Sequence, residues 1–246
     1  MPDRVLIMSA LAGELSLLGE VMTDVEITEV GAHEFRLGSV GSRPVVTTAA
    51  GIGKVNAAMV ATLAVEHFRP SAVLVTGVAG GLDETLQIGD IVIGERVLHH
   101  DTGVFEPEGF HLYQSGHVPF VNPTDRLGYF PSKDLLDRVR LTIPHVHLST
   151  VLGREPRIVF GTIATGDQFV NTEIERRRLF DRVGALVVEM EGSAVAQVAD
   201  HFGVDHLVIR AVSDLAGSNS GIDFARFFDE VAANSVRIVT TLLQER

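Results

Sequence analysis

Hydrophobic residues along the chain form short continuous runs that alternate with longer stretches of helical spacing. Short apolar runs are typical of buried strands, whereas apolar residues repeating every three or four positions indicate a helix packed on a core. The runs predict strands at residues 5–9, 26–38, 43–48, 72–76, 91–97, 157–164, 186–188 and 207–212. The helical spacing predicts helices at residues 11–21, 56–67, 192–202 and 225–243. This alternation indicates an α/β domain with helices on a mostly parallel sheet.

Residues 101–135 break this pattern. They are rich in Gly, Pro, His and Phe and show no clean period. A connection of this length inside a compact domain is usually a lid, a binding loop or an interface element. It is too short to be a domain, so we expect a single domain over residues 1–246.

Composition narrows the classes of function. Asp and Glu number 32 against 20 Lys and Arg, which gives a net charge of −12 and argues against nucleic acid or an anionic membrane as the main partner. The absence of cysteine excludes disulfides, thiolate catalysis and Cys-ligated metals. No apolar run reaches the roughly 18 residues of a membrane span. Residues 4–12 only faintly resemble a signal peptide, so we expect a cytoplasmic protein.

Two glycine clusters follow predicted strands. Gly51-Ile-Gly53-Lys54 fails as a P-loop, because Thr48 and Val55 stand where the motif needs Gly and Ser or Thr. It predicts either a simple tight turn or a turn whose backbone approaches a ligand. Residues 76–82, Thr-Gly-Val-Ala-Gly-Gly-Leu, come directly after a strand. In open α/β sheets ligands bind beyond strand ends, so both clusters are candidates for a site.

Acidic residues gather at the same predicted edge. Glu14 lies just past the first strand, Glu189 and Glu191 follow another, and Asp214 ends the last one. Each has an alternative interpretation as a helix-start or capping residue. Arg210 stands within an apolar run and needs a partner carboxylate, which we expect to be Glu189 or Glu191. Grouped carboxylates without a thiol or a Ser–His triad motif suggest acid–base work on a sugar-like bond.

Other candidates are weaker. His99-His100-Asp101 suggests a metal, but no further ligands stand at a recognisable spacing, so we predict no metal site. The aromatics Phe105, Phe169 and Phe224 lie beside the segments above, and such residues are core more often than ligand platforms.

A family resemblance rests on motifs spread over nearly the whole chain: residues 10–18, 51–55, 76–82, 89–92, 165–171, 188–191 and 210–214. The most specific pair is Val188-Glu-Met-Glu191 with Ser213-Asp214 further on. With these motifs the chain resembles bacterial 5′-methylthioadenosine/S-adenosylhomocysteine nucleosidases, which have the nucleoside phosphorylase fold. The resemblance implies a single α/β domain around a central mixed, partly barrel-like sheet flanked by helices, and a homodimer. It also implies hydrolysis of adenine nucleosides without cofactor or metal.

The resemblance further implies a role for each catalytic position. Glu14 would take a proton from the attacking water, and Glu191 would hold the ribose 2′- and 3′-hydroxyls. Asp214 would deliver a proton to adenine N7, which requires a raised pKa. Ser213 and Arg210 would support Asp214, the glutamates (Glu189 among them) and the water.

Substrate contacts follow from the same resemblance. Phe169 would stack on the base, and the backbone of Val170 would read the edge that distinguishes adenine from a 6-oxo purine. Met190 and Phe224 would line the ribose and the 5′ pocket. The segment 102–135, including Val104, would shape the 5′ pocket and the dimer contact, and it differs from the versions expected in the family.

One departure concerns residue 78. Many family members carry Ser there, whereas this chain has Val78, so a hydroxyl near the water or ribose is missing. Phosphorylases of the fold typically carry Arg and Ser around this turn, and neither stands here. We therefore expect water rather than phosphate as the nucleophile. The alternatives are a phosphorylase, a nucleosidase for futalosine-type nucleosides or 5′-deoxyadenosine, and a non-catalytic nucleoside-binding protein.

Overall fold

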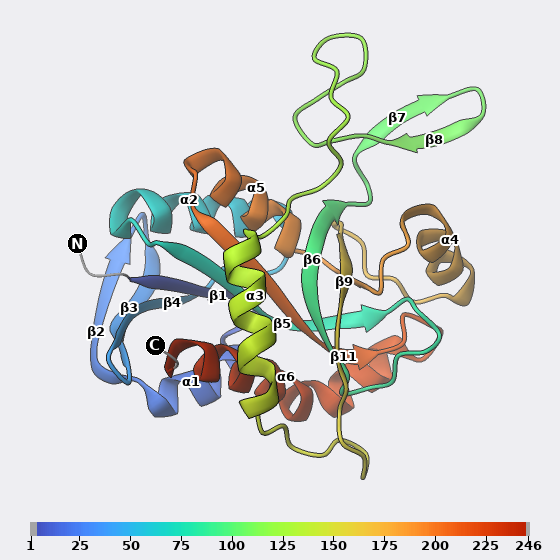
Figure 1. Ribbon diagram of the computed structural model, residues 1–246. Helices are drawn as coiled ribbons and strands as arrows, with labels where there is room; N and C mark the ends of the chain where they lie inside the picture. Colours follow the sequence, from blue (N-terminus) through green and yellow to red (C-terminus); the bar gives the residue numbers. More distant parts are fainter. Residues whose placement is uncertain (1–3, 245–246) are drawn as a thin grey trace.

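The computed structural model describes residues 4–244, and its core is a nine-stranded mixed sheet (Figure 1). The strand order is β10-β9-β6-β11-β5-β1-β4-β3-β2. The strands are β1 (Val5–Ser9), β2 (Thr23–Val30), β3 (His33–Val40), β4 (Arg43–Ala49), β5 (Ala72–Gly81), β6 (Ile91–His99), β9 (Ile158–Thr165), β10 (Val187–Glu189) and β11 (Asp205–Asp214).

Part of the sheet closes on itself. Strand β10 pairs with β9 on one side and antiparallel with β5 on the other, where Val187 lies opposite Gly81. Strands β5, β11, β6, β9 and β10 therefore form a closed, barrel-like unit. The pairs β6–β11, β5–β10, β3–β4 and β2–β3 are antiparallel. The mixed, partly barrel-like sheet is thus confirmed, and the broader expectation of a mostly parallel sheet is too simple.

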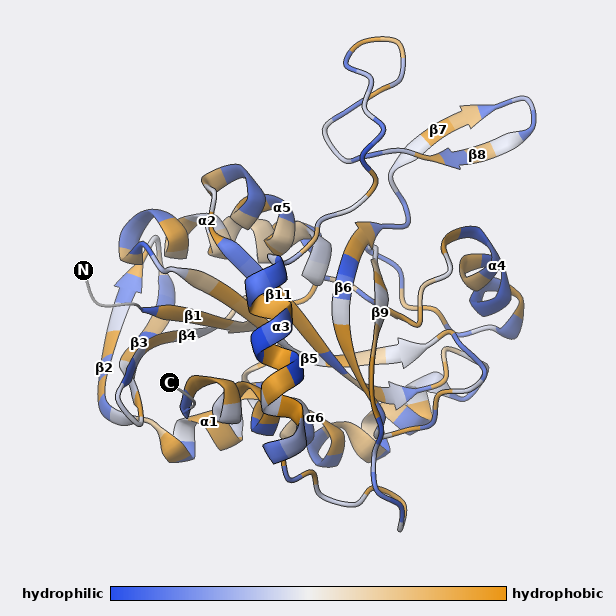
Figure 2. Ribbon diagram, viewed as in Figure 1, coloured by the Kyte–Doolittle hydropathy of each residue, from blue (hydrophilic) through white to orange (hydrophobic). Residues whose placement is uncertain are grey.

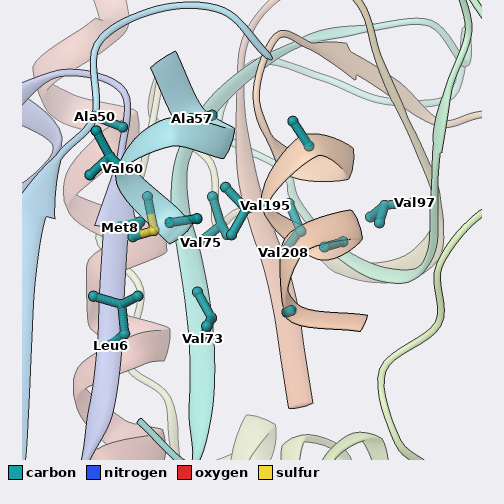
Figure 3. Close-up of a cluster of buried hydrophobic side chains, with 14 of the residues drawn as sticks. Leu6, Met8, Ala50, Ala57, Val60, Val73, Val75, Val97, Val195 and Val208 are labelled. Atoms are coloured by element: carbon teal, nitrogen blue, oxygen red, sulfur yellow. The ribbon is translucent and has the colours of Figure 1, made fainter. Parts of the chain in front are cut away.

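Helices cover the sheet on two sides (Figure 1). Helices α2 (Lys54–Phe68) and α5 (Gly192–Phe202) pack against each other, while α6 (Ser220–Gln244) lies on β11 and β5 beside α1 (Ser16–Val21). The strands between them are mostly hydrophobic, whereas the helices mix hydrophobic and hydrophilic residues (Figure 2). Under α2 and α5 the core contains Met8, Val60, Val75 and Val195 (Figure 3).

The predicted strand 5–9 and helix 192–202 are confirmed at their stated bounds. The predicted strand 26–38 is wrong, because the chain reverses at Gly31 and Ala32, both with positive φ, and forms the β2–β3 hairpin. The predicted helix 11–21 begins with a 3-10 turn, Ala12–Leu15, that continues into α1. The glycine-rich segment 76–82 is mostly strand, since β5 extends to Gly81.

Two helices were not expected from the sequence, α3 (Lys133–Thr142) and α4 (Glu173–Val183). Residues 101–135 contain a small hairpin, β7 (Gly103–Glu106) and β8 (Gly109–Leu112), that projects from the body of the molecule (Figure 1). Within residues 4–244, no helix is both long and apolar enough to cross a membrane.

Candidate active site

A cavity of about 210 Å³ opens at the ends of strands β1, β10 and β11 and beside β5. Glu14 follows β1, residues 78–80 belong to β5, Glu189 ends β10 and Asp214 ends β11. The predicted residues that line it are Glu14, Val78, Phe169, Val170, Glu189, Met190, Glu191, Ser213, Asp214 and Phe224. The structure therefore brings together side chains that lie far apart in the sequence, from Glu14 to Phe224.

The hydrogen bonds to the Glu14 carboxylate all come from backbone N–H groups. Its Oε2 accepts from the N–H groups of Ala10 (3.0 Å) and Leu11 (2.8 Å), and its Oε1 accepts from that of Val78 (3.1 Å). The side chain is almost fully buried. Burial raises the pKa of Glu14, although Arg210 and the three N–H groups oppose the rise. The result is a fixed carboxylate that is more basic than an exposed one.

Arg210 is fully buried, and it has the carboxylate partners that the sequence led us to expect. Its Nη2 donates to Oε2 of Glu189 and, at 3.4 Å, to Oε2 of Glu191, while Nη1 donates to the Thr76 carbonyl at 3.1 Å. Both expected carboxylates are thus partners of Arg210. The guanidinium itself does not line the cavity, so it acts on the site through the two glutamates.

Glu189 and Glu191 have different surroundings. Glu189 accepts hydrogen bonds from the Glu191 and Gly192 N–H groups and from the Thr165 hydroxyl. The carboxylate of Glu191 receives the Gly53 N–H at 2.9 Å and the long contact from Arg210. Burial raises the pKa of Glu191 to about 7 against the pull of Arg210, and the charge of Glu189 adds to the rise. Glu191 therefore keeps free hydrogen-bonding capacity toward the cavity.

Asp214 lies at the end of β11, 3% exposed. Its Oδ1 accepts from the Ala216 N–H at 2.9 Å, and its Oδ2 accepts from the Ser213 hydroxyl at 3.0 Å. Burial raises the pKa of Asp214, while these hydrogen bonds oppose the rise. A carboxyl group in this position is suited to donate a proton into the cavity.

Aromatic and apolar residues cover the opposite side of the cavity. Phe169 packs edge-to-face on Phe224 with ring centroids 6.4 Å apart, and its side chain is 55% exposed. Val170 is buried directly after it, and Met190 lies in the chain between Glu189, which ends β10, and Glu191. A half-exposed ring at a cavity mouth is available to stack on a planar ligand.

Val104 does not line this cavity. It pairs with His111 in the hairpin β7–β8, which projects from the body of the molecule (Figure 1). Sequence reasoning also missed members of the lining, namely Ala10, Leu11, Ile52, Ala79, Gly80, Gln168 and Val188. Most of them lie inside the motifs of the resemblance, so the motifs themselves were the available signal.

Among residues 4–244, one group of three side chains, Glu106, Glu108 and His111, places its potential metal-ligand atoms within 4.8 Å of one another. These residues are exposed on the β7–β8 hairpin and do not line the cavity. His99 and His100 are buried, and burial lowers the pKa of both, of His99 to about 4. They are therefore neutral core residues at ordinary pH, and the expectation of a metal-free site stays a prediction.

The charge of the lining restricts the ligand. Four carboxylates face the cavity, whereas none of the lining residues is Lys, Arg or His. A dianion would meet repulsion without a compensating cation. A neutral molecule with hydroxyls, a planar ring and a site of developing positive charge suits this lining.

The chain matches known proteins over nearly its full length. The sequence profile of the Phosphorylase superfamily matches residues 4–244. A 5′-methylthioadenosine/S-adenosylhomocysteine nucleosidase of Mycobacterium bovis is 45% identical over 243 residues, covering 96% of this chain and 95% of that protein.

Two solved structures show the same fold. The nucleosidase of Neisseria meningitidis in complex with methylthio-immucillin-A has a TM-score of 0.86 and 30% identity, covering 98% of this chain and 99% of that one. The native futalosine hydrolase of Helicobacter pylori has a TM-score of 0.85 and 25% identity, covering 99% and 98%. The full-length identity and the shared fold establish that this chain belongs to the 5′-methylthioadenosine/S-adenosylhomocysteine nucleosidase family within the phosphorylase superfamily.

Proposed function

We propose that this chain hydrolyses the N-glycosidic bond of 5′-substituted adenine nucleosides, giving adenine and a 5-substituted ribose. The observation that carries the proposal is a cavity lined by four carboxylates and otherwise mostly apolar groups. Glycosidic cleavage passes through an oxocarbenium-like state, and a carboxylate beside the ribose stabilises its positive charge. The relatives named as nucleosidases support the same substrate class.

Glu14 is the base that takes a proton from the attacking water. Three backbone N–H groups fix its carboxylate, so no side-chain partner has to move before reaction. Its raised pKa increases its strength as a base. The Val78 N–H is one of the three donors, so this contact does not depend on the side chain at position 78.

Glu191 accepts the ribose 2′- and 3′-hydroxyls and places negative charge beside the developing cation. Its own donors are a backbone N–H and a long contact from Arg210, which leave lone pairs for the hydroxyls. The carboxylate oxygens of Glu189 already accept hydrogen bonds from the backbone, Thr165 and Arg210. Glu189 therefore fixes the end of β10 and does not bind the sugar. Met190 lies against the ribose from the same segment.

Asp214 is the acid that protonates adenine N7. Burial keeps its pKa above the usual range, which favours the protonated form needed for donation. The Ser213 hydroxyl orients it from the neighbouring position. Phe169 stacks on the base, the backbone of buried Val170 reads its edge, and Phe224 closes the 5′ side of the pocket.

Water is the nucleophile, since the cavity offers nothing to hold phosphate. Arg210 contacts two of the lining glutamates, and its guanidinium already donates to Glu189, Glu191 and the Thr76 carbonyl. Glu14 stands where a phosphate would have to approach. A phosphorylase of this fold is therefore the less favoured reaction.

We further propose that the whole chain, residues 1–246, is one nucleosidase domain that works without cofactor or metal. We propose a cytoplasmic homodimer that serves methionine salvage, because the relatives' named substrates carry sulfur derived from methionine. The projecting segment is defined as residues 101–135, which include the β7–β8 hairpin, and its exposed apolar residues Phe105 and Phe120 support a contact with a second copy.

The test is adenine release from four nucleosides: 5′-methylthioadenosine, S-adenosylhomocysteine, 5′-deoxyadenosine and aminofutalosine. We expect the two sulfur nucleosides to be cleaved with the highest kcat/KM. A preference for aminofutalosine would assign the chain to the futalosine-type reaction, which the structural likeness to futalosine hydrolase keeps as second candidate. Tight binding without release from any of the four would identify a binding protein.

A further inference from the structure

Three residues outside the cavity lining form a closed ring of polar contacts. Lys54 Nζ donates to both oxygens of Asp101, at 2.6 and 2.8 Å. Asp101 Oδ2 also accepts from the Asp167 N–H at 3.1 Å, and Asp167 Oδ1 accepts from the Lys54 N–H at 2.8 Å. Each residue thus contacts the other two. Lys54 is the first residue of α2, and Asp101 and Asp167 each lie two residues beyond the end of a strand, β6 and β9 respectively.

The ring is connected to the cavity on both sides. Gly53, the residue before Lys54, donates its N–H to Oε1 of Glu191 at 2.9 Å. On the other side, Asp167 is followed by three lining residues, 168–170, which include Phe169. The ring therefore joins the segment that holds the ribose carboxylate to the segment that carries the base-stacking ring.

Two of the three side chains in the ring are shielded from solvent, whereas that of Asp167 is exposed. The side chains of Lys54 and Asp101 are only 20% and 17% exposed. Burial would raise the pKa of Asp101, but hydrogen bonds from Lys54 and the Asp167 N–H outweigh it and lower the pKa, so Asp101 stays charged near neutral pH. At the start of the loop formed by residues 166–170, Gly166 packs tightly on His100. A Cβ at position 166 would lie 2.2 Å from the imidazole Nε2 of His100.

Taking the proposed nucleosidase function as its basis, we propose that Lys54, Asp101 and Asp167 are positioning residues that set the distance between Glu191 and the loop 166–170. Cleavage needs the base-binding and ribose-binding halves of the site to be correctly placed at the same moment. A displacement of about 1 Å at such a site costs roughly 100-fold in rate. Each half can still bind its own part of the substrate when the ring is broken, but the two no longer act together.

The test compares a ligand that fills only the base-binding half of the site with a ligand that fills both halves. Lys54→Met removes the ammonium and keeps the length of the side chain. We expect kcat to fall by about 10- to 100-fold. The Kd of adenine, which occupies only the base half, should change little, whereas the Kd of a cationic ribose mimic carrying an adenine-like base should rise about tenfold or more. Lys54→Arg should restore part of both losses.

The chain supplies a matched control, because Lys133 is its one other lysine. Lys133 pairs with Asp137 on the exposed helix α3 and lines no part of the cavity. Lys133→Met should leave kcat and both affinities at wild-type values. If Lys54→Met does not fold, Asp101→Asn replaces it, since an amide still accepts from the Asp167 N–H while losing the charge that holds Lys54.

Equal weakening of adenine and the mimic, or no weakening of either, would overturn the positioning role. Both affinities are measured without turnover, so this result is separate from the fate of the proposed reaction. A wild-type protein that binds both ligands but releases no adenine would contradict the nucleosidase proposal while leaving the coupling between the two halves testable.

Discussion

Arg210 is the one guanidinium among three buried carboxylates, those of Glu14, Glu189 and Glu191. Its contacts with Glu189 and Glu191 are direct, and its charge also lowers the pKa of Glu14. One positive charge cannot balance three negative ones in a buried site, so protons must make up part of the difference. Burial is the main cause of the raised pKa values of Glu14 and Glu191, and for Glu191 the charges of Glu189 and Glu14 add to the rise.

The raised pKa of Glu191 predicts a pH effect on stability. The folded state raises the pKa of Glu191 from 4.5 to about 7, so it holds a proton that the unfolded chain has released. The free energy of unfolding contributed by this group therefore falls as pH rises from about 4.5 to 7. Glu191→Gln cannot ionise, so its melting temperature relative to wild type should be higher at pH 8 than at pH 5. Calorimetry without ligand measures this, and a difference independent of pH would contradict it.

Asp214 carries the sharpest prediction about catalysis. Asp214→Asn keeps the shape and the acceptor for the Ala216 N–H but cannot deliver a proton. We expect kcat to fall by roughly 10² to 10⁴, the usual contribution of a general acid, with nucleoside binding largely retained. Single-turnover kinetics and equilibrium binding separate the two effects. Retained wild-type kcat would remove Asp214 from proton transfer.

At the scale of elements, β5 passes so close to the site that it requires a glycine. A Cβ on Gly77 would lie 2.3 Å from Arg210 Nη1 and 2.4 Å from Glu14 Oε1. Gly77→Ala must therefore displace the guanidinium or the proposed base. We expect kcat/KM to fall by about 100-fold, because small misplacements of reacting groups are this costly.

The control for Gly77→Ala is Gly19→Ala on α1, where a Cβ would meet nothing within 4 Å. That variant should keep wild-type kcat/KM. Undiminished activity in Gly77→Ala would mean that the close approach of β5 has no bearing on catalysis.

The sequence predicted the helices and strands whose apolar residues form a clear run or repeat, and it did not predict those that lack such a pattern. Helix α4 escaped because charged residues dominate it, and its ends are marked by the Thr172 cap and by Gly184 at positive φ. The β2–β3 hairpin was predicted as one strand because Ala32 occupies a turn position, with positive φ, that a periodicity argument cannot see. Closure of the barrel through β10 and β5 depends on long-range pairing and has no local signature.

Part of the site was predictable because burying a carboxylate at a strand end is unfavourable unless the group is hydrogen-bonded or binds a ligand. Glu14, Glu189, Glu191 and Asp214 were found in this way, and the partner of Arg210 followed from burial. The roles of the individual acids came from the family resemblance. The ring of Lys54, Asp101 and Asp167 was out of reach, because three residues in separate segments meet only after the chain has folded.

At the scale of the molecule, the projecting segment predicts self-association. Phe105 and Phe120 are 86% and 84% exposed there, which is unusual for large apolar side chains unless a partner covers them. We expect sedimentation at twice the 26.5 kDa chain mass and a shift toward monomer for the double variant Phe105→Ser, Phe120→Ser. A wild-type monomer at all concentrations would contradict the homodimer.

The central claim is that this acidic cavity uses water. The most direct measurement follows adenine release from 5′-methylthioadenosine in phosphate-free buffer and in added phosphate, and identifies the sugar product. We predict equal rates in both buffers and free 5-methylthioribose as the product, because Glu14 repels phosphate and the lining holds no cation. Release that requires phosphate and yields a ribose 1-phosphate would contradict the account.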